Sequence, residues 1–498
     1  MYRYTSSALK PQTAQAGAKN ESSRESLYMI KNISFDNFKR FKSEAIDLEK
    51  PITLLYGENS SGKSSILKGL VAILQTFSWT RNKHEPLVTQ GEYANLGIFK
   101  DYVHNHEVSK KITISITING SHWGRMLDSD SDSDSDNERR SYVAKLCYER
   151  SPYTEQARIY SIEVSSLARD GSSREIFKLK KAETKSYYTL TTDPNVLGRW
   201  LNIYLSKTIA DKDLKRLASL KTKLNYTEGF TFVLASGKSD DLAANKIRVM
   251  DRFIYMLFDL HDNYKYLGPL RSSPSRSYTL SVAGSDVGSK GENTPSVISY
   301  LKRSSESVKA NKDAYKKIQH WTDLLFPGRS ITVEDYEELV KIKIRRGGIA
   351  DSIQDVGFGF SQILPILVQA AALTRNQTMI IEQPELHLHP RAQVAFSRFL
   401  VEACREGKRF IIETHSEHIL RGLQLAISEN SINDRLGIKK DDLKVYYFPS
   451  DPDSRAFEIE INDNGELVNG WPAGFFDESY NLTKQIINNK ITKLVSLS

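Results

Sequence analysis

Residues 57–64 read GENSSGKS, and this stretch decides the fold class of a chain of 498 residues. It matches the pattern G-x-x-x-x-G-K-[ST], in which backbone N–H groups of a glycine-rich loop cradle phosphate groups. The apolar run ITLLY before it predicts a buried strand, and SSILKGLVAIL after it has apolar residues at helical spacing. Because free N–H groups and a helix dipole then face an anion, the stretch predicts an α/β fold that binds a nucleoside triphosphate.

The residues of this loop have distinct expected roles toward ATP and Mg²⁺, the two cofactors that the sequence predicts. The glycines let the backbone approach the phosphates, Lys63 reaches the β- and γ-phosphates, and Ser64 ligates Mg²⁺. The predicted ATP-contacting residues of the loop are Gly57, Glu58, Asn59, Ser60, Ser61, Gly62, Lys63, Ser64 and Ser65.

A second motif follows the apolar run 379–381 in the segment TMIIEQPE. The carboxyl ends of parallel strands are where α/β sheets place their ligands, so Glu382 at this strand end is predicted to hold Mg²⁺ opposite Ser64. In an alternative assignment the motif is shifted by one register along the chain, so that Glu385 binds the metal in place of Glu382. The strand-end position favours Glu382.

The residue after this acid determines the expected rate of hydrolysis. Such motifs usually carry two adjacent acids, the second of which activates water, but here the second position is Gln383. An amide orients water without deprotonating it. A general base contributes ~10²–10⁴-fold in rate, so slow ATP hydrolysis is expected. Glu385, just beyond Pro384, is a candidate substitute base.

A third motif, FIIETHS (410–416), repeats the pattern of a buried strand closed by polar residues. It follows the acidic motif after one amphipathic helical segment, PRAQVAFSRFLVEACREG, which ends at Gly407. The order of loop lysine, strand-end acid, helix and strand-end histidine, from Lys63 through Glu382 to His415, indicates an ATPase.

The segments NFKRF (37–41) and GENSSGKSS (57–65) resemble the heads of ABC-type ATPases of the SMC and OLD (overcoming-lysogenization-defect) kinds. The resemblance implies a mixed sheet with flanking helices plus an N-terminal antiparallel β layer that covers the nucleotide. Lys39 and Arg40 are then expected near ATP, although a solvated basic turn is the alternative. It also implies that His415 senses the γ-phosphate.

ABC-type heads present a second helix N-terminus to the γ-phosphate held by an opposite subunit. The candidate is DVGFGFSQILPIL (355–367), in which a glycine-rich loop precedes an apolar helix that we expect to begin at Ser361 and Gln362. Free N–H groups and a hydroxyl suit an anion. The expected contacts are Gly359, Ser361 and Gln362, although the sequence departs from the usual leucine-serine-glycine-glycine-glutamine form. The resemblance thus implies a homodimer or higher homo-oligomer joined through its ATP-binding heads.

The same segment, with IEQPELHLHP, ETHSEHIL, NGWPAGFFDE and YLGPLRSSPSRSY, resembles a bacterial group of ABC-type ATPases from anti-phage defence operons. That group includes ATPases of Septu-like systems and of retron operons that pair an ATPase with an HNH nuclease. The resemblance covers residues 28–118 and 330–480. It implies a sensor or regulatory subunit with a separate effector, a nuclease such as the HNH type. The alternative is an SMC-like DNA-repair or DNA-binding ATPase that acts directly on DNA.

The expected organisation is a disordered tail (1–27), a first head lobe with the phosphate loop (28–118), an insertion (119–335) and a second head lobe (336–498). The insertion is expected to be mainly α-helical, with a disordered acidic loop at 127–139 that holds the run DSDSDSDSDN. A large mainly α-helical insertion in an ABC-type P-loop ATPase head is thus the expected fold.

Composition limits the remaining possibilities. The formal net charge of +8 makes nucleic acid a further candidate partner, although a solvated basic surface explains it equally well. Two cysteines cannot form a disulfide framework, no apolar run reaches the ~18 residues that span a membrane, and the N-terminus lacks the apolar core of a signal peptide. A cytoplasmic protein without membrane contact is expected.

Overall fold

The computed structural model describes residues 29–78, 85–119, 141–168, 170–183, 186–198, 222–234, 241–281, 284–434, 436–451, 453–471 and 484–489. The expected N-terminal tail and the acidic loop 127–139 lie outside the described residues, as does most of the segment NGWPAGFFDE.

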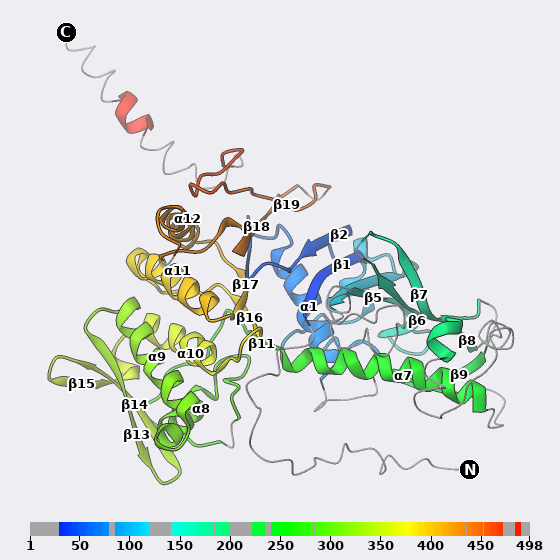
Figure 1. Cartoon of the computed structure of the whole chain (residues 1–498), viewed down its shortest axis with the longest axis horizontal. Helices are drawn as coiled ribbons and strands as arrows, with labels where there is room; N and C mark the ends of the chain where they lie inside the picture. Colours follow the sequence, from blue (N-terminus) through cyan, green and yellow to red (C-terminus); the bar gives the residue numbers. More distant parts are fainter. Residues whose placement is uncertain are drawn as a thin grey trace.

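A six-stranded sheet forms the centre of the molecule, in the order β11-β16-β17-β3-β18-β19 (Figure 1). All neighbouring pairs are parallel except β18 with β19. β3 and β16 are buried along their whole length, as expected for parallel strands covered on both faces. The strands are Ile52–Gly57 (β3), Tyr264–Leu267 (β11), Thr378–Glu382 (β16), Arg409–Glu413 (β17), Leu443–Phe448 (β18) and Phe457–Glu458 (β19).

A nine-stranded antiparallel sheet forms a second layer, in the order β10-β9-β8-β7-β6-β5-β4-β1-β2. Together with the mixed central sheet and its helices, it confirms the α/β head with an antiparallel β layer that the sequence predicts. Its strands are Ile30–Phe38 (β1), Phe41–Asp47 (β2), Ile112–Asn119 (β4), Ser141–Arg150 (β5), Ala157–Leu167 (β6), Ser173–Lys181 (β7), Tyr187–Thr192 (β8), Thr222–Glu228 (β9) and Thr231–Leu234 (β10).

The expectation of a mainly α-helical insertion at 119–335 is wrong for the first part of that region. Strands β5 to β10 extend the layer begun by β1, β2 and β4, so a single sheet contains strands from both sides of the expected domain boundary at residue 118. Alternating burial along these strands, as in β6, is the period of a half-buried strand rather than of a helix. The later part contains the expected helices, α7 to α9.

Helices fill the space beside both faces of the central sheet. α1 packs between the two sheets, where Gly69 is required because a Cβ there would lie 2.5 Å from the ring of Phe35. Helices α8 to α12 cover the opposite face (Figure 1). None of the described helices is both long and apolar enough to cross a membrane. Their bounds are Lys63–Thr76 (α1), Phe99–Tyr102 (α2), Asp241–Asp262 (α7), Thr294–Arg303 (α8), Lys309–Leu325 (α9), Phe358–Ala372 (α10), Pro390–Arg405 (α11) and Glu417–Ile432 (α12).

A third, four-stranded antiparallel sheet lies beside α8 and α9, at the edge of the molecule away from the nine-stranded layer (Figure 1). It consists of Tyr278–Thr279 (β12), Arg329–Tyr336 (β13), Leu339–Arg346 (β14) and Ile349–Ser352 (β15). The short helix Ile353–Asp355 (η4) then leads from β15 to α10.

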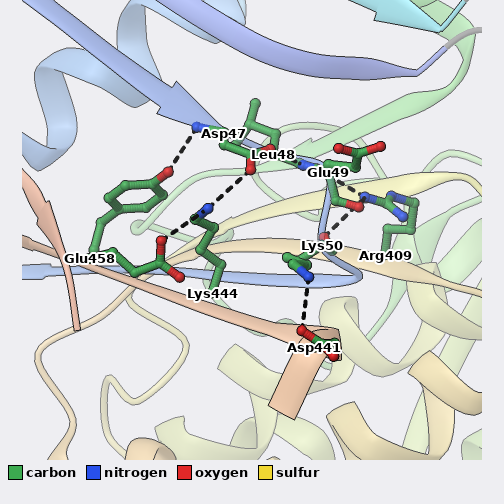
Figure 2. A network of polar contacts seen from close by, with 9 residues as sticks. Asp47, Leu48, Glu49, Lys50, Arg409, Asp441, Lys444 and Glu458 are labelled. Carbon is green, nitrogen blue, oxygen red and sulfur yellow. Dashed lines mark hydrogen bonds and ion pairs between the residues drawn. The ribbon is translucent and has the colours of Figure 1, made fainter. Parts of the chain in front are cut away.

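Polar contacts join the turn after β2 to the amino ends of β17 and β18 (Figure 2). The guanidinium of Arg409 donates to the backbone oxygens of residues 48, 49 and 50, at 2.9, 2.7 and 3.0 Å. Lys444 lies 3.0 Å from both Asp47 and Glu458. These contacts hold the antiparallel layer on the central sheet at the edge opposite the loop 57–64.

Candidate nucleotide-binding site

The phosphate loop joins the buried end of β3 to the first turn of α1. Gly57 and Gly62 have φ angles of 149° and 103°, values that side chains rarely adopt. A Cβ at Gly57 would also lie 2.4 Å from the backbone oxygen of Phe448, so only glycine fits there. Ser60 has φ of 61° and, with Glu58 and Asn59, is exposed, whereas Ser61 is buried and Ser64 and Ser65 are half-buried. The loop therefore has the strained, glycine-dependent geometry of an anion cradle.

Lys63 lies inside this loop. Its ammonium donates to the backbone oxygens of Gly57 at 2.9 Å and Glu58 at 2.6 Å, and the residue is only 3% exposed. Burial lowers its pKa, an effect opposed by the negative charges of Glu413, Glu385 and Glu58. A cation held by carbonyl groups at the centre of the cradle is positioned to exchange those acceptors for phosphate oxygens.

Ser64 bonds to an acid that the sequence analysis did not select. Its hydroxyl donates to Glu413 Oε1 at 2.7 Å, whereas Glu382 Oε1 accepts a bond from the hydroxyl of Tyr266, also at 2.7 Å. Strand order explains this pairing, because β17 lies between β16 and β3 and places Glu413 nearer to the loop. One available signal is the repeat of MIIE in FIIE, which ends both buried strands in glutamate.

The two strand-end acids and Ser64 are suited to Mg²⁺. Glu382 and Glu413 face each other in register, and Glu413 Oε2 is buried without a hydrogen-bond partner in the described structure. Burial raises the pKa of Glu413 to about 7 and also raises the pKa of Glu382. Carboxylate and hydroxyl oxygens are the donors that Mg²⁺ prefers, and a bound cation would stabilise both ionised forms. Within the described residues no group of three His, Cys, Asp or Glu side chains is placed to hold a metal ion.

This electrostatic arrangement predicts pH-dependent binding of Mg²⁺ and nucleotide. With a pKa near 7, Glu413 is mostly protonated at pH 6 and mostly ionised at pH 8. Mg²⁺-dependent nucleotide affinity should therefore rise about ten-fold between pH 6 and pH 8, with proton release on binding. Isothermal titration of wild type and Glu413→Gln measures both the affinity and the protons released.

In the absence of metal, Glu413 should also make the stability of the fold depend on pH. Because its pKa is raised in the folded state, its contribution to the free energy of unfolding is lost as pH rises from about 4.5 to about 7, and Glu413→Gln should remove this pH dependence. A glutamine variant with the wild-type pH profile would contradict this assignment.

Gln383 lies directly after Glu382 in a strained conformation. Its φ is 47°, its backbone N–H donates to the backbone oxygen of Glu413 at 2.7 Å, and its side chain is half-buried. The buried guanidinium of Arg271 donates to the backbone oxygens of Glu382 at 2.7 Å and of Gln383 at 3.2 Å. Arg271 is thus directed at the backbone of the acidic motif. The backbone at the expected hydrolytic position is therefore held from two sides.

Glu385 holds the segment that carries the predicted γ-phosphate sensor. One carboxylate oxygen accepts a bond from the hydroxyl of Thr414 and the other from the backbone N–H of His415, both at 2.7 Å. Burial raises the pKa of Glu385. His415 is half-buried, and burial followed by the charge of Lys63 lowers its pKa. A neutral imidazole near the loop lysine can exchange hydrogen bonds with a phosphate, and Glu385 fixes its backbone.

The helix expected to begin at Ser361 and Gln362 begins earlier. α10 starts at Phe358 after Gly357, whose φ is 93°, so Ser361 and Gln362 lie buried in its first turns. The hydroxyl of Ser361 donates to the backbone oxygen of Phe358 at 2.8 Å. The expectation that these two residues begin the helix is therefore wrong; the free N–H groups belong to the first turn, which includes Gly359. A Cβ at Gly359 would lie 2.5 Å from the backbone oxygen of His387, so glycine allows α10 to pack on that turn.

A basic pocket of about 630 Å³ opens at this helix N-terminus. Arg329 and Arg346 lie opposite each other on β13 and β14, a like-charge pairing that destabilises a sheet unless an anion is present. Neither arginine has an ion-pair partner among the described residues, and none of the described residues that line the pocket is acidic. Phe358 is 58% exposed at its rim. The residues that line it are Leu325, Phe326, Pro327, Arg329, Arg346, Val356, Gly357, Phe358, Gly359, Phe360, His387, His389, Arg391 and Ala392.

Lys39 and Arg40 lie in the turn between β1 and β2. Arg40 contacts the phosphate loop, because its guanidinium donates to the backbone oxygens of Ser60 at 3.3 Å and of Asp451 at 2.6 Å. Lys39 has a φ of 49°, and burial lowers its pKa. The structure thus brings Arg40 against the loop, and the role expected for both residues toward ATP stays a prediction.

The glycine cradle, its lysine and the strand-end acids on a parallel sheet define a P-loop nucleoside triphosphatase. A protein-family model described as AAA ATPase domain matches residues 29–420, which is most of the chain. The chain therefore belongs to this family of ATPases. A second model, described as a protein of unknown function (DUF3696), matches residues 438–486.

Solved structures similar to this chain include heads of SMC proteins. An SMC head bound to the C-winged helix domain of ScpA is 12% identical, with a TM-score of 0.38, and covers 87% of this chain and 98% of its own. The SMC head domain from Thermotoga maritima is 13% identical, with a TM-score of 0.33 and coverages of 87% and 99%. An SMC head domain bound to the C-terminal domain of ScpA derived from Pyrococcus furiosus is 14% identical, with a TM-score of 0.38 and coverages of 87% and 96%. No curated protein sequence matches the chain.

Proposed function

We propose that this ATPase is a slow switch that spends most of its cycle bound to ATP. The observation that carries the proposal is Gln383, which stands directly after the strand-end acid where a carboxylate would activate water. Its amide can orient water but cannot accept a proton. Glu385, the nearest alternative base, already holds Thr414 and His415 with both oxygens. Hydrolysis then relies on positioning and charge stabilisation, which keeps the ATP-bound state long-lived.

The residues of the cradle have separate roles in this proposal. The N–H groups of residues 57–65 and the ammonium of Lys63 bind the phosphates, and Ser64 with Glu413 and Glu382 would hold Mg²⁺. The bound ion would neutralise charge that develops on the phosphates. His415 would contact the γ-phosphate, and Lys39 and Arg40 would approach the nucleotide from the β layer.

A second copy of the chain would complete the site. The pocket beside the N-terminus of α10 has no acidic side chain among its described lining residues, and the paired positive charges of Arg329 and Arg346 favour a polyphosphate. In a head-to-head dimer, the ATP held by one copy would lie against this surface of the other. ATP binding would then drive self-association, and hydrolysis would release it.

Charge reversal in the basic pocket tests this arrangement. Arg346→Glu should weaken ATP-driven self-association by roughly ten-fold or more, because a like charge then meets the phosphates. The affinity of the isolated chain for ATP should change by less than about two-fold, since the cradle is untouched. Mass measurement with and without ATP gives the first quantity, and a fluorescent ATP analogue gives the second.

Arg345→Glu is the matched control for that experiment. Arg345 is the exposed neighbour of Arg346 on β14, and successive side chains of a strand point to opposite faces. The control should associate like wild type. Equal self-association of wild type and Arg346→Glu would remove the support for a second copy at this pocket.

We further propose that the switch is the sensor or regulatory subunit of a bacterial anti-phage defence system and restrains a separate effector, a nuclease such as the HNH type. The support is the resemblance of the acidic, histidine and α10 motifs to ATPases of such operons. The alternative is an SMC-like ATPase that acts directly on DNA. A second polypeptide in the complex purified from the native operon favours the regulatory role, whereas tight, salt-dependent DNA binding by the chain alone favours the alternative.

A further inference from the structure

Two short segments, the first of which begins at the end of β11, contact both the acidic motif and α10. We name residues 266–276 and 285–293 together the coupling loop. Its two segments are joined by backbone hydrogen bonds, from Gly268 to Ser289 at 2.9 Å and from Ser272 to Lys290 at 2.8 Å. A displacement of one segment therefore moves the other.

The first end of the coupling loop holds the hydrolytic residues. The hydroxyl of Tyr266 donates to the carboxylate of Glu382 at 2.7 Å. Arg271, which is 6% exposed, donates to the backbone oxygens of both Glu382 and Gln383. One planar guanidinium thus bridges the two backbone oxygens on either side of the α-carbon of Gln383, those of the predicted metal ligand and of the residue expected to orient water.

The second end of the coupling loop holds α10. The side-chain amide of Gln369 accepts a bond from the backbone N–H of Val287 at 2.9 Å and donates to the backbone oxygen of Ser285 at 3.1 Å. Gly291 packs so closely on Pro365 of α10 that a Cβ would lie 2.6 Å from the proline ring. These contacts fix the middle of the helix to the loop.

An ion pair adds a third contact at the helix N-terminus. The guanidinium of Arg276 donates to both carboxylate oxygens of Asp355 at 3.0 Å. Asp355 ends η4, two residues before the glycine that precedes α10. The coupling loop therefore contacts the segment that leads into α10 and, through Arg271, the backbone of Glu382 and Gln383.

We propose that the coupling loop transmits engagement of α10 by a second copy to Glu382 and Gln383, with Arg271 as the positioning residue. This inference rests on the proposed function, because it requires a second copy to bind at the α10 N-terminus. When α10 is engaged, the loop holds the peptide between Glu382 and Gln383 in its productive position. When α10 is free, that peptide loses one of its restraints, and hydrolysis within a lone copy slows.

The exposed ion pair offers a test that leaves the fold intact, since such pairs contribute little to stability. Arg276→Ala and Asp355→Ala should each lower kcat about five-fold at saturating ATP and high protein concentration, with KM changed by less than about two-fold. The charge-exchanged double variant, Arg276→Asp with Asp355→Arg, should recover at least half of the wild-type kcat. Arg271→Lys keeps the charge but loses the planar fork of N–H donors and shortens the reach to the two carbonyls, and should show the same loss of kcat without a change in KM.

Arg174→Ala is the matched control, because Arg174 also makes a two-bond pair, with Asp193 in the antiparallel layer, although that pair is less exposed. It should keep the wild-type kcat. Wild-type kcat in both single variants, or failure of the exchanged pair to recover it, overturns the coupling while leaving the proposed switch intact. A wild-type protein whose turnover per molecule does not rise with protein concentration contradicts the proposed dimer itself.

Discussion

Lys63→Ala should remove most ATP binding and lower ATP turnover by roughly 10²–10³-fold. The ammonium of Lys63 lies at the centre of the cradle, held by the backbone oxygens of Gly57 and Glu58. No other lysine or arginine lies within residues 57–65, so alanine leaves the loop itself without a positive charge to face a triphosphate that carries several negative charges. Removing a preorganised cation from a buried site costs both ground-state and transition-state binding, so KM should rise and kcat should fall together.

The measurement compares equilibrium binding of ATP and steady-state turnover in wild type and variant. Lys316→Ala is a matched control, because Lys316 is also a helical lysine but is exposed on α9, far from the loop in sequence. A thermal scan without nucleotide separates loss of binding from loss of fold. If Lys63→Ala binds ATP as tightly as wild type, residues 57–65 are not the phosphate cradle.

Local sequence patterns predicted the parts of the site whose geometry depends on neighbouring residues. The glycine loop, the strand before it and the helix after it follow one another within residues 52–76. The glycines of the loop mark the positions where the backbone takes φ angles that other residues rarely adopt. Glu382 and His415 likewise follow apolar runs that read as buried strands. Each of these assignments uses only the period and the end of a single element.

The missed features depend on pairing between distant segments. Glu413 becomes the partner of Ser64 because β17 lies between β16 and β3, an order that no local period encodes. Arg271 contacts the acidic motif only because β11 pairs with β16. The start of α10 was placed three residues late because Phe358 and Phe360 suit either a loop or a buried turn, and Gly357 alone marks the boundary.

The antiparallel layer was also only partly predictable from local sequence patterns. The sequence of β4 alternates cleanly between apolar and polar residues, and its burial alternates in the same way. The later strands of the layer are interrupted by β-bulges, as between Cys147 and Tyr148 and between Val164 and Ser165, where the pairing register shifts. A register shift moves side chains to the opposite face of the sheet, which blurs the period of two in the sequence.

Gln383→Glu should accelerate ATP hydrolysis by roughly 10²-fold or more, because it introduces the general base that the wild-type site lacks. The change is nearly isosteric, and the backbone of residue 383 is held independently by Arg271 and by the backbone of Glu413, so the new carboxylate should occupy the position of the amide. Glu382, Glu385 and Glu413 lie close by, and their like charges raise the pKa of the introduced acid. The gain in turnover should therefore increase with pH.

The same variant tests whether slow hydrolysis is what keeps the ATP-bound dimer long-lived. If slow hydrolysis keeps the closed dimer long-lived, then faster turnover in Gln383→Glu must shorten the lifetime of the ATP-induced dimer while leaving ATP affinity nearly unchanged. Gln383→Asn, which keeps an amide but shortens it, is the control and should show no acceleration. If Gln383→Glu hydrolyses ATP no faster than wild type, the amide does not limit the reaction. The slow step must then lie elsewhere, either in the protonation state of Glu413 or in the approach of a second copy to α10. Because hydrolysis would be limited by a step that precedes or follows water activation, a long-lived ATP state could no longer be attributed to residue 383.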